Sequence, residues 1–358
     1  MTTSLERPQK DQPTSDRPFK QSKRIPAGSV WVVWTLAGLA LVTGFVTDLG
    51  GAKGFGLAWL IAASIPAMSF AVEGRRKATD RFVTLLVVTA FTVAVIPLVS
   101  IISTVFAKGF PVMSSEFFTS SMRNVVGEGG GINHAIVGTL IITGLATIIS
   151  VPIGLFAAIY LVEYSEDSRT AHGLRFLVDV MTGIPSIVAG LFAYALFVLF
   201  FGEGVRMGLG GAVALSVLMI PVVIRSSEEM LKLVPNELRE ASWALGVPRW
   251  RTILKVVLPT ALAGIATGVT LAIARVIGET APLLIIAGIT DSVNTNPLEG
   301  RMATLPVFAY SAMMNPGVPP EPSIARAWGA ALTLLIIVMA LNLIARLISA
   351  FFSPAKGR

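Results

Sequence analysis

Long apolar stretches alternate with short polar segments along this chain. Eight of the apolar stretches are long enough, or nearly so, to cross a bilayer as an α-helix, which takes roughly 20 residues. They cover residues 30–47, 54–72, 82–107, 134–162, 176–201, 208–224, 259–288 and 328–351. The sixth stretch is the shortest and has Pro221 near its end, but the charge pattern described below requires a span there. The pattern predicts an all-α polytopic membrane protein.

Composition supports a membrane environment. Of the 358 residues, 54% are hydrophobic and only 14% are charged, and the mean hydropathy is +0.75. A soluble domain of this size cannot bury so much apolar surface, so lipid is the solvent for most of the chain. Residues 1–28 are rich in Pro, Lys, Arg, Gln and Ser, which predicts a disordered cytoplasmic tail. The first apolar stretch lacks an obvious cleavage site, so we interpret it as an anchor span.

Basic residues gather in alternate polar segments. If the chain starts inside the cell and crosses eight times, the inside segments carry 21 of the 28 Lys and Arg residues, the outside segments carry six, and Arg275 lies within a span. Because Lys and Arg concentrate on the cytoplasmic side of membrane proteins, this asymmetry predicts that both termini are cytoplasmic. It also accounts for the net charge of +7 without a nucleic-acid partner.

The spacing of the spans predicts two parts after the tail. Residues 29–72 form an accessory two-span hairpin, a basic linker follows at 73–81, and residues 82–352 form a six-span core. Two long outside loops lie at 108–133 and 289–327. Each is either a solvated connector or a contact for an extracytoplasmic partner, and the pattern leaves both readings open.

A polar, basic segment between the sixth and seventh apolar stretches predicts a helix-turn-helix on the cytoplasmic side. Ser226 and Glu229 fit a capping box, Pro235 suits the first turn of a helix, and Gly246 suits a C-terminal stop. A second, amphipathic helix follows at roughly a right angle to the first. Such a hairpin either docks a partner protein or rests on the lipid surface, and the pattern alone does not choose between them.

This segment resembles the signature of ABC importer permeases, which reads Glu-Ala-Ala, three residues, Gly, nine residues, Ile-x-Leu-Pro. Five residues fall at the offsets of the signature: Glu240, Ala241, Gly246, Leu258 and Pro259. Two residues depart from it, because Ser242 replaces the second Ala and Val256 replaces Ile. The resemblance implies that residues 226–258 form a coupling loop that docks on a separate ATPase subunit. It also implies the six-span core of a type I importer permease.

Three further runs, at residues 183–188, 225–231 and 274–284, look like the PstA-type permeases of phosphate importers. The resemblance covers roughly residues 82–352. It implies a permease subunit of the bacterial inner membrane that imports inorganic phosphate by alternating access. It further implies three partners: a homologous second permease, a dimer of ATPase subunits and an extracytoplasmic phosphate-binding protein. This chain would bind no cofactor, because ATP and Mg belong to the partner ATPase.

Charged residues within the spans are candidates for the substrate path. Arg275 falls near the middle of the seventh apolar stretch, where a charge costs roughly 2.5–3.5 kcal/mol. Glu279 lies one helical turn further on. Arg275 either contacts a passing anion, with Glu279 holding its guanidinium when the path is empty, or the two form a permanent ion pair that locks the bundle. Arg225, at the inner end of the sixth stretch, either binds the anion on exit or reaches for lipid headgroups.

Several chemistries have no support in the sequence. There is no cysteine and no phosphate-binding loop, and the two histidines are not clustered at metal-ligand spacing, so the chain is neither the ATPase nor a predicted metal protein. No nucleophile–base set predicts an enzyme. The alternatives left open are a permease for another oxyanion such as sulfate or molybdate, an ATP-independent secondary anion transporter, and a membrane enzyme or sensor subunit.

Overall fold

The computed structural model describes residues 25–46, 51–165 and 168–352, and every regular element in these ranges is helical. Most of the predicted tail, residues 1–24, lies outside the described residues. The chain forms two compact units, Met1–Ile101 and Ile102–Arg358. Their boundary falls within α3 (Arg75–Gly109), whereas the sequence placed it at the linker 73–81. The difference arises because Leu85 of α3 is buried together with residues of the hairpin.

The first unit contains α1 (Ala27–Val46), α2 (Gly51–Val72) and the first part of α3. α1 and α2 approach closely at two glycines, since a Cβ built on Gly44 would lie 2.3 Å from the Cα of Gly54. Such small residues allow helices to pack backbone to backbone in a membrane. Glu73 follows α2 and is held by the backbone N–H of Ile25 at 2.9 Å and by Arg81 at 2.8 Å.

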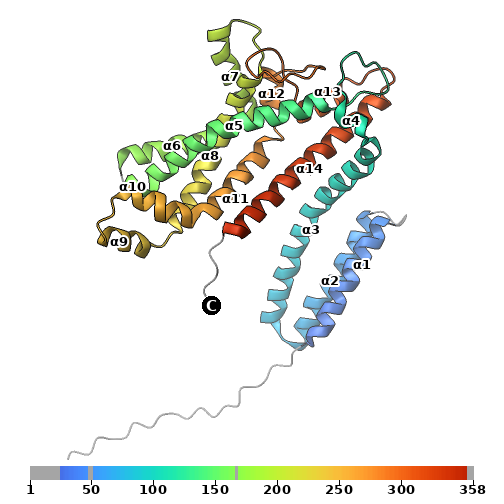
Figure 1. Ribbon diagram of the computed structural model, residues 1–358. Coiled ribbons are helices and arrows are strands. Elements are labelled where there is room, and N and C mark those ends of the chain that lie inside the picture. The colour runs from blue at the N-terminus through green and yellow to red at the C-terminus, as the bar shows by residue number, and fades with distance from the viewer. Residues whose placement is uncertain (1–24, 47–50, 166–167, 353–358) are drawn as a thin grey trace, which may run out of the picture. The chain divides into compact units, whose positions relative to one another are not determined.

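The second unit is built around α8 (Gly208–Lys232), which contacts α5 (Asn133–Ile159) and α11 (Leu258–Val276), while α11 also contacts α14 (Glu321–Phe352). Figure 1 shows these long helices running side by side. Their core contains Ile142, Leu215, Met219 and Val276, all fully buried. Three of the shorter elements of this unit are η1 (Phe110–Val112), α4 (Ser115–Thr119) and α13 (Leu305–Met314).

The fifth predicted span, 176–201, is not one straight helix. It is replaced by α6 (Arg169–Thr182) and α7 (Ser186–Phe201), which meet at an angle of 107°. Gly183 and Pro185 lie at the break, and proline can neither donate a helical hydrogen bond nor continue the preceding helix. In the described residues, six helices are long and apolar enough to span a membrane, or seven if this bent pair is one span. The predicted count of eight stays a prediction, because the first predicted span, 30–47, extends beyond the described residues.

The seventh predicted span, 259–288, also ends early. α11 stops at Val276, and a separate short helix, α12 (Ala281–Ile286), follows it. Arg275 therefore lies in the last turn of α11 rather than near the middle of a long span. The predicted capping box at Ser226 is likewise wrong, because α8 continues to Lys232 and the Ser226 hydroxyl donates to the Val223 carbonyl inside the helix at 3.2 Å.

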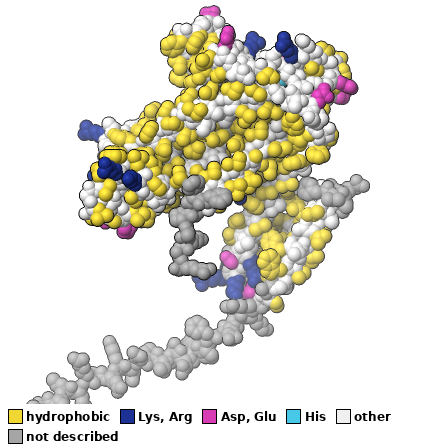
Figure 2. All heavy atoms as spheres, viewed as in Figure 1, with side chains coloured by type: hydrophobic (Ala, Val, Ile, Leu, Met, Phe, Trp, Pro, Cys, Tyr) yellow, Lys and Arg dark blue, Asp and Glu magenta, His cyan; other side chains and the backbone are white. Residues whose placement is uncertain are grey.

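The surface of the second unit agrees with a lipid environment. Figure 2 shows hydrophobic side chains over most of its long helices, with Lys and Arg at the end that carries α9 (Asn236–Ala244) and α10 (Arg249–Thr252) and also at the opposite end. The charge pattern predicts that the end with α9 and α10 is cytoplasmic.

Candidate functional site

The candidate coupling segment was predicted as residues 226–258, but residues 226–232 belong to α8, so the segment outside the spans begins after Lys232. Pro235 precedes α9, and α9 ends at a turn in which Gly246 has φ +75°. The N–H of Gly246 donates to the Trp243 carbonyl at 2.9 Å, and the N–H of Val247 donates to the Ser242 carbonyl at 3.2 Å. Because L side chains rarely adopt this backbone conformation, glycine is the natural C-terminal stop here.

The second helix of the segment is not a separate short element. α10 begins after Pro248 and continues through the π-helical turn η3 (Ile253–Val257) into α11. A single apolar helix of 28 residues, Arg249–Val276, thus joins the segment to the membrane.

The signature residues divide between the two helices. Glu240, Ala241 and Gly246 are exposed on α9 and its turn, while the half-buried Leu258 and the exposed Pro259 begin α11. Ser242 is buried, and its hydroxyl lies 2.8 Å from that of Thr252. The departure from the signature at this position therefore adds a hydrogen bond between α9 and α10.

Large apolar side chains surround the exposed signature residues. Trp243 is 42%, Leu245 is 83% and Trp250 is 53% exposed. Arginines stack on both rings, Arg249 on Trp243 and Arg251 on Trp250, with centroid distances of 5.6 and 5.0 Å. Exposed aromatic and arginine side chains are enriched at protein–protein interfaces, so this face can bind a partner.

Arg239 ties α9 to the end of two spans. Its Nε and Nη2 lie 3.1 and 2.8 Å from Oε1 of Glu163, which belongs to η2 (Tyr160–Tyr164), the π-helical turn that ends α5. Its Nη1 and Nη2 also donate to the carbonyls of Val234 and Leu231 at 2.6 and 2.9 Å. Arg239 is buried, and so is the Glu163 side chain. Sequence reasoning gave Arg239 no such role, because its partner lies 76 residues away.

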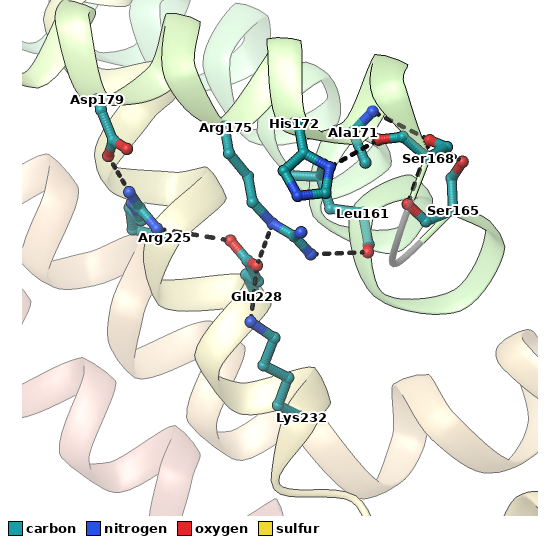
Figure 3. Close-up of polar contacts among 10 residues, drawn as sticks. All are labelled: Leu161, Ser165, Ser168, Ala171, His172, Arg175, Asp179, Arg225, Glu228 and Lys232. Carbon is teal, nitrogen blue, oxygen red and sulfur yellow. Dashed lines mark hydrogen bonds and ion pairs between the residues drawn. The ribbon is translucent and has the colours of Figure 1, made fainter.

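A second charged network lies where α6 crosses α8, and Figure 3 shows its members pointing toward one another. Its centre is Glu228, whose side chain is only 4% exposed. Lys232 and Arg175 reach this carboxylate at 2.8 and 3.2 Å, and Arg225 approaches it at 3.9 Å. Three cations thus share one buried carboxylate, which lowers the cost of burying it.

Arg225, a predicted path residue, is held inside this network. It pairs with Asp179 of α6 as well as approaching Glu228. Its side chain remains 43% exposed, so the guanidinium is accessible although it is paired. An anion that binds Arg225 must compete with the two carboxylates. Nothing in the sequence pattern links residues 179 and 225, which only the packing of α6 on α8 brings together.

Arg275 and Glu279 lie on either side of the end of α11. Arg275 is exposed and Glu279 is half-buried, and within the described ranges no ion pair or hydrogen bond joins them. At about 1.5 Å of rise per residue, Arg275 lies roughly 26 Å along α11 from Leu258, whereas Arg225 lies roughly 10 Å from the end of α8 at Lys232. The predicted path residues therefore sit at two depths.

The long apolar helices define a multi-pass membrane protein. The family described as "Binding-protein-dependent transport system inner membrane component" matches residues 150–358. "Phosphate transport system permease protein PstA 1" of Mycobacterium tuberculosis (strain CDC 1551 / Oshkosh) is 46% identical over 277 residues, covering 76% of this chain and 90% of that protein. The chain therefore belongs to the PstA family of phosphate transport system permeases.

Other relatives and solved structures agree. The PstA protein of Mycobacterium leprae (strain TN) is 44% identical, over 76% of this chain and 89% of its own length. The PstA protein of Pasteurella multocida (strain Pm70) is 40% identical, over 72% of this chain and 88% of its own length. A chain of the MetNI methionine ABC transporter, solved in inward-facing conformations, has a TM-score of 0.51 at 18% identity over 68% of this chain and 100% of its own. A chain of a bacterial alginate ABC transporter has a TM-score of 0.52 at 14% identity over 76% and 96%. The two structures support the fold alone.

Proposed function

We propose that this chain is a permease subunit of an ATP-driven importer of inorganic phosphate in the bacterial inner membrane. The observation that carries the proposal is the 46% identity to a protein named as a phosphate transport permease, over 76% of the chain. The exposed signature residues on α9 and at the start of α11 support it, because they offer a docking surface to a second protein. The chain itself is not catalytic.

The partners follow from this proposal. A dimer of ATPase subunits holds ATP and Mg and docks on residues 226–258 of this chain. A homologous second permease completes the transmembrane path, and an extracytoplasmic phosphate-binding protein delivers the ion. An external energy source is required, because each negative charge moved into the cell costs roughly 2.3 kcal/mol per 100 mV of inside-negative potential.

In this proposal, two arginines at different depths of the membrane contact phosphate along its path. Arg275, exposed beside the break after α11, contacts phosphate first, with Glu279 nearby to limit its affinity. Arg225 receives phosphate closer to the cytoplasm, where Asp179 and Glu228 compete for the same guanidinium. The planar guanidinium suits a tetrahedral oxyanion because it donates two charge-assisted hydrogen bonds at once. Competition from carboxylates keeps binding weak enough for release.

ATP-dependent uptake by the complete complex tests the proposal. The chain is reconstituted in proteoliposomes with its second permease and ATPase, and labelled phosphate uptake is measured with the binding protein present. Uptake that requires ATP and is not reduced by excess sulfate or molybdate is the expected result. Efficient competition by sulfate or molybdate would reassign the substrate, and uptake by this chain without ATP would identify a secondary transporter.

A further inference from the structure

We propose that the Arg239–Glu163 ion pair is the positioning contact through which the coupling segment moves α5 and α8. The inference rests on the proposed function, because it describes how an ATPase docked on α9 would act on the spans. Neither residue belongs to the exposed docking surface. Their role is to hold that surface to the bundle while it moves.

The geometry joins three elements at one side chain. The guanidinium of Arg239, on α9, pairs with Glu163 in the turn that ends α5. It also donates to the carbonyl of Leu231 in the last turn of α8 and to that of Val234 just beyond this helix. The Leu231 carbonyl also accepts from the backbone N–H of Val234 at 3.3 Å, so Arg239 adds a further contact at the end of α8. A shift of α9 therefore displaces the ends of α5 and α8 together.

Burial makes the contact strong enough to transmit movement. Arg239 is 7% exposed, and the Glu163 side chain is 6% exposed, so salt and water screen the pair only weakly. Separating the two groups would leave an uncompensated buried charge, which is strongly unfavourable. The pair is therefore expected to persist while the segment moves, unlike the exposed pair of Arg225 and Asp179.

The turn η2, which contains Glu163, also contacts α6. Arg175 donates to the Leu161 carbonyl in η2 at 3.3 Å and to Glu228 of α8 at 3.2 Å. The turn η2 is thus held from α9 on one side and from α6 on the other. π-Helical turns inside α-helices are often found at functional sites. Movement that reaches η2 through Arg239 is passed to α6, which leads to the 107° break before α7.

The position of Arg239 in α9 fits this role. It directly precedes Glu240, and successive residues of an α-helix point about 100° apart. Arg239 is buried against the bundle, whereas Glu240 is exposed. A single turn of α9 therefore presents a docking residue outward and a linking residue inward.

The test compares the ratio of phosphate imported to ATP hydrolysed. Glu163→Gln and Arg239→Gln are each reconstituted in the complete complex with both permeases, the ATPase and the binding protein. We expect each variant to lower the ratio by about tenfold, within the usual range of coupling between linked sites. The double variant is expected to be no worse than Arg239→Gln alone, because the ion pair is already lost in that single variant. Arg239→Lys, which keeps the charge, is expected to recover part of the ratio.

Arg169→Gln is the matched control. Arg169 is exposed at the start of α6 on the same side, and no hydrogen bond or ion pair is found for it among the described residues, so the ratio should stay at the wild-type value. If uptake and hydrolysis fall in proportion in the Glu163 and Arg239 variants, the pair is only structural and the inference is overturned. If the wild-type complex shows no ATP-dependent uptake, the proposed function fails, and this inference fails with it.

Replacing the Arg239–Glu163 ion pair with a covalent cross-link distinguishes a role in transmitting movement from a role in folding. The chain has no cysteine, so a double variant, Glu163→Cys with Arg239→Cys, carries the only two thiols. Before cross-linking, we expect this variant to have a low ratio of phosphate imported to ATP hydrolysed. Treatment of the same assembled sample with a short bifunctional thiol reagent should restore the ratio. A ratio that is equal before and after cross-linking would contradict the proposal.

Discussion

Gly246 illustrates how one backbone angle shapes the docking surface. Its φ of +75° turns the chain between α9 and α10, and no atom lies within 4 Å of a Cβ built there. A side chain at this position therefore meets no steric obstacle from its neighbours. The penalty for a substitution comes from the backbone conformation alone, roughly 1–2 kcal/mol for an L residue and more for a β-branched one.

Gly246→Val is expected to uncouple ATP hydrolysis from phosphate uptake, because a β-branched residue resists the left-handed turn and misplaces α9. Gly246→Asn is the matched control, since asparagine tolerates this conformation better than other residues. Uptake and hydrolysis are measured in the reconstituted complex. Uptake by the valine variant equal to that of wild type would remove the role assigned to this turn.

Arg275→Gln is expected to abolish phosphate uptake while the complex still assembles. Arg275 is exposed and no ion pair holds it in the described part of the chain, so its removal leaves no buried carboxylate without a partner. Arg275→Lys keeps the charge but loses the two-pronged donor geometry and is expected to retain reduced uptake. Copurification of the partner subunits measures assembly. Normal uptake by Arg275→Gln would make this residue dispensable.

At the scale of elements, the contact between α8 and α11 positions both Arg225 and the coupling segment. Two glycines of α11 allow it: a Cβ on Gly268 would lie 2.6 Å from the Cβ of Ser226, and one on Gly264 would lie 2.3 Å from the Sδ of Met230. Ser226 directly follows Arg225 in the chain. α8 and α11 can therefore approach this closely because Gly264 and Gly268 of α11 have no side chain.

Gly268→Ala is expected to destabilise the protein by about 1–3 kcal/mol, the usual cost of overpacking a close contact. Gly144→Ala, in α5, is the control: no atom lies within 4 Å of its Cβ position, and alanine favours a helix interior by about 0.5–1 kcal/mol. Thermal unfolding of the purified protein in detergent compares the two. Equal unfolding temperatures for both variants would contradict the close contact described here.

The whole molecule consists of two units with separate cores. Ala37, Ala58, Ala62 and Leu85 form the buried cluster of the first unit. The other clusters of the described residues, including the one beneath the coupling segment with Leu231 and Val257, are drawn from the second unit alone. The proposed docking surface and the predicted path residues also belong to the second unit, so we expect transport not to require the first unit.

Deletion of residues 1–72 is expected to leave a chain that inserts, assembles with its partners and supports ATP-dependent uptake, because every cluster of the second unit is retained. Deletion of residues 1–24 alone serves as the control for the loss of the basic N-terminal segment. Membrane fractionation and uptake assays measure the result. A chain that fails to insert without residues 1–72 would show that the hairpin is needed for the function.

The sequence by itself determined the class of this protein. Apolar length and charge asymmetry depend only on local composition, so the membrane class follows from them. The signature at Glu240, Gly246 and Pro259 is also local, so the sequence alone predicts a coupling segment there. The tertiary structure decided which prolines break a span and which charges meet. Gly183 and Pro185 lie at the 107° bend between α6 and α7, whereas α5 and α8 continue through Pro152 and Pro221, and a hydropathy pattern does not distinguish the two cases. Arg225 with Asp179, and Arg239 with Glu163, are joined across 46 and 76 residues, and only the helix contacts bring such distant side chains together.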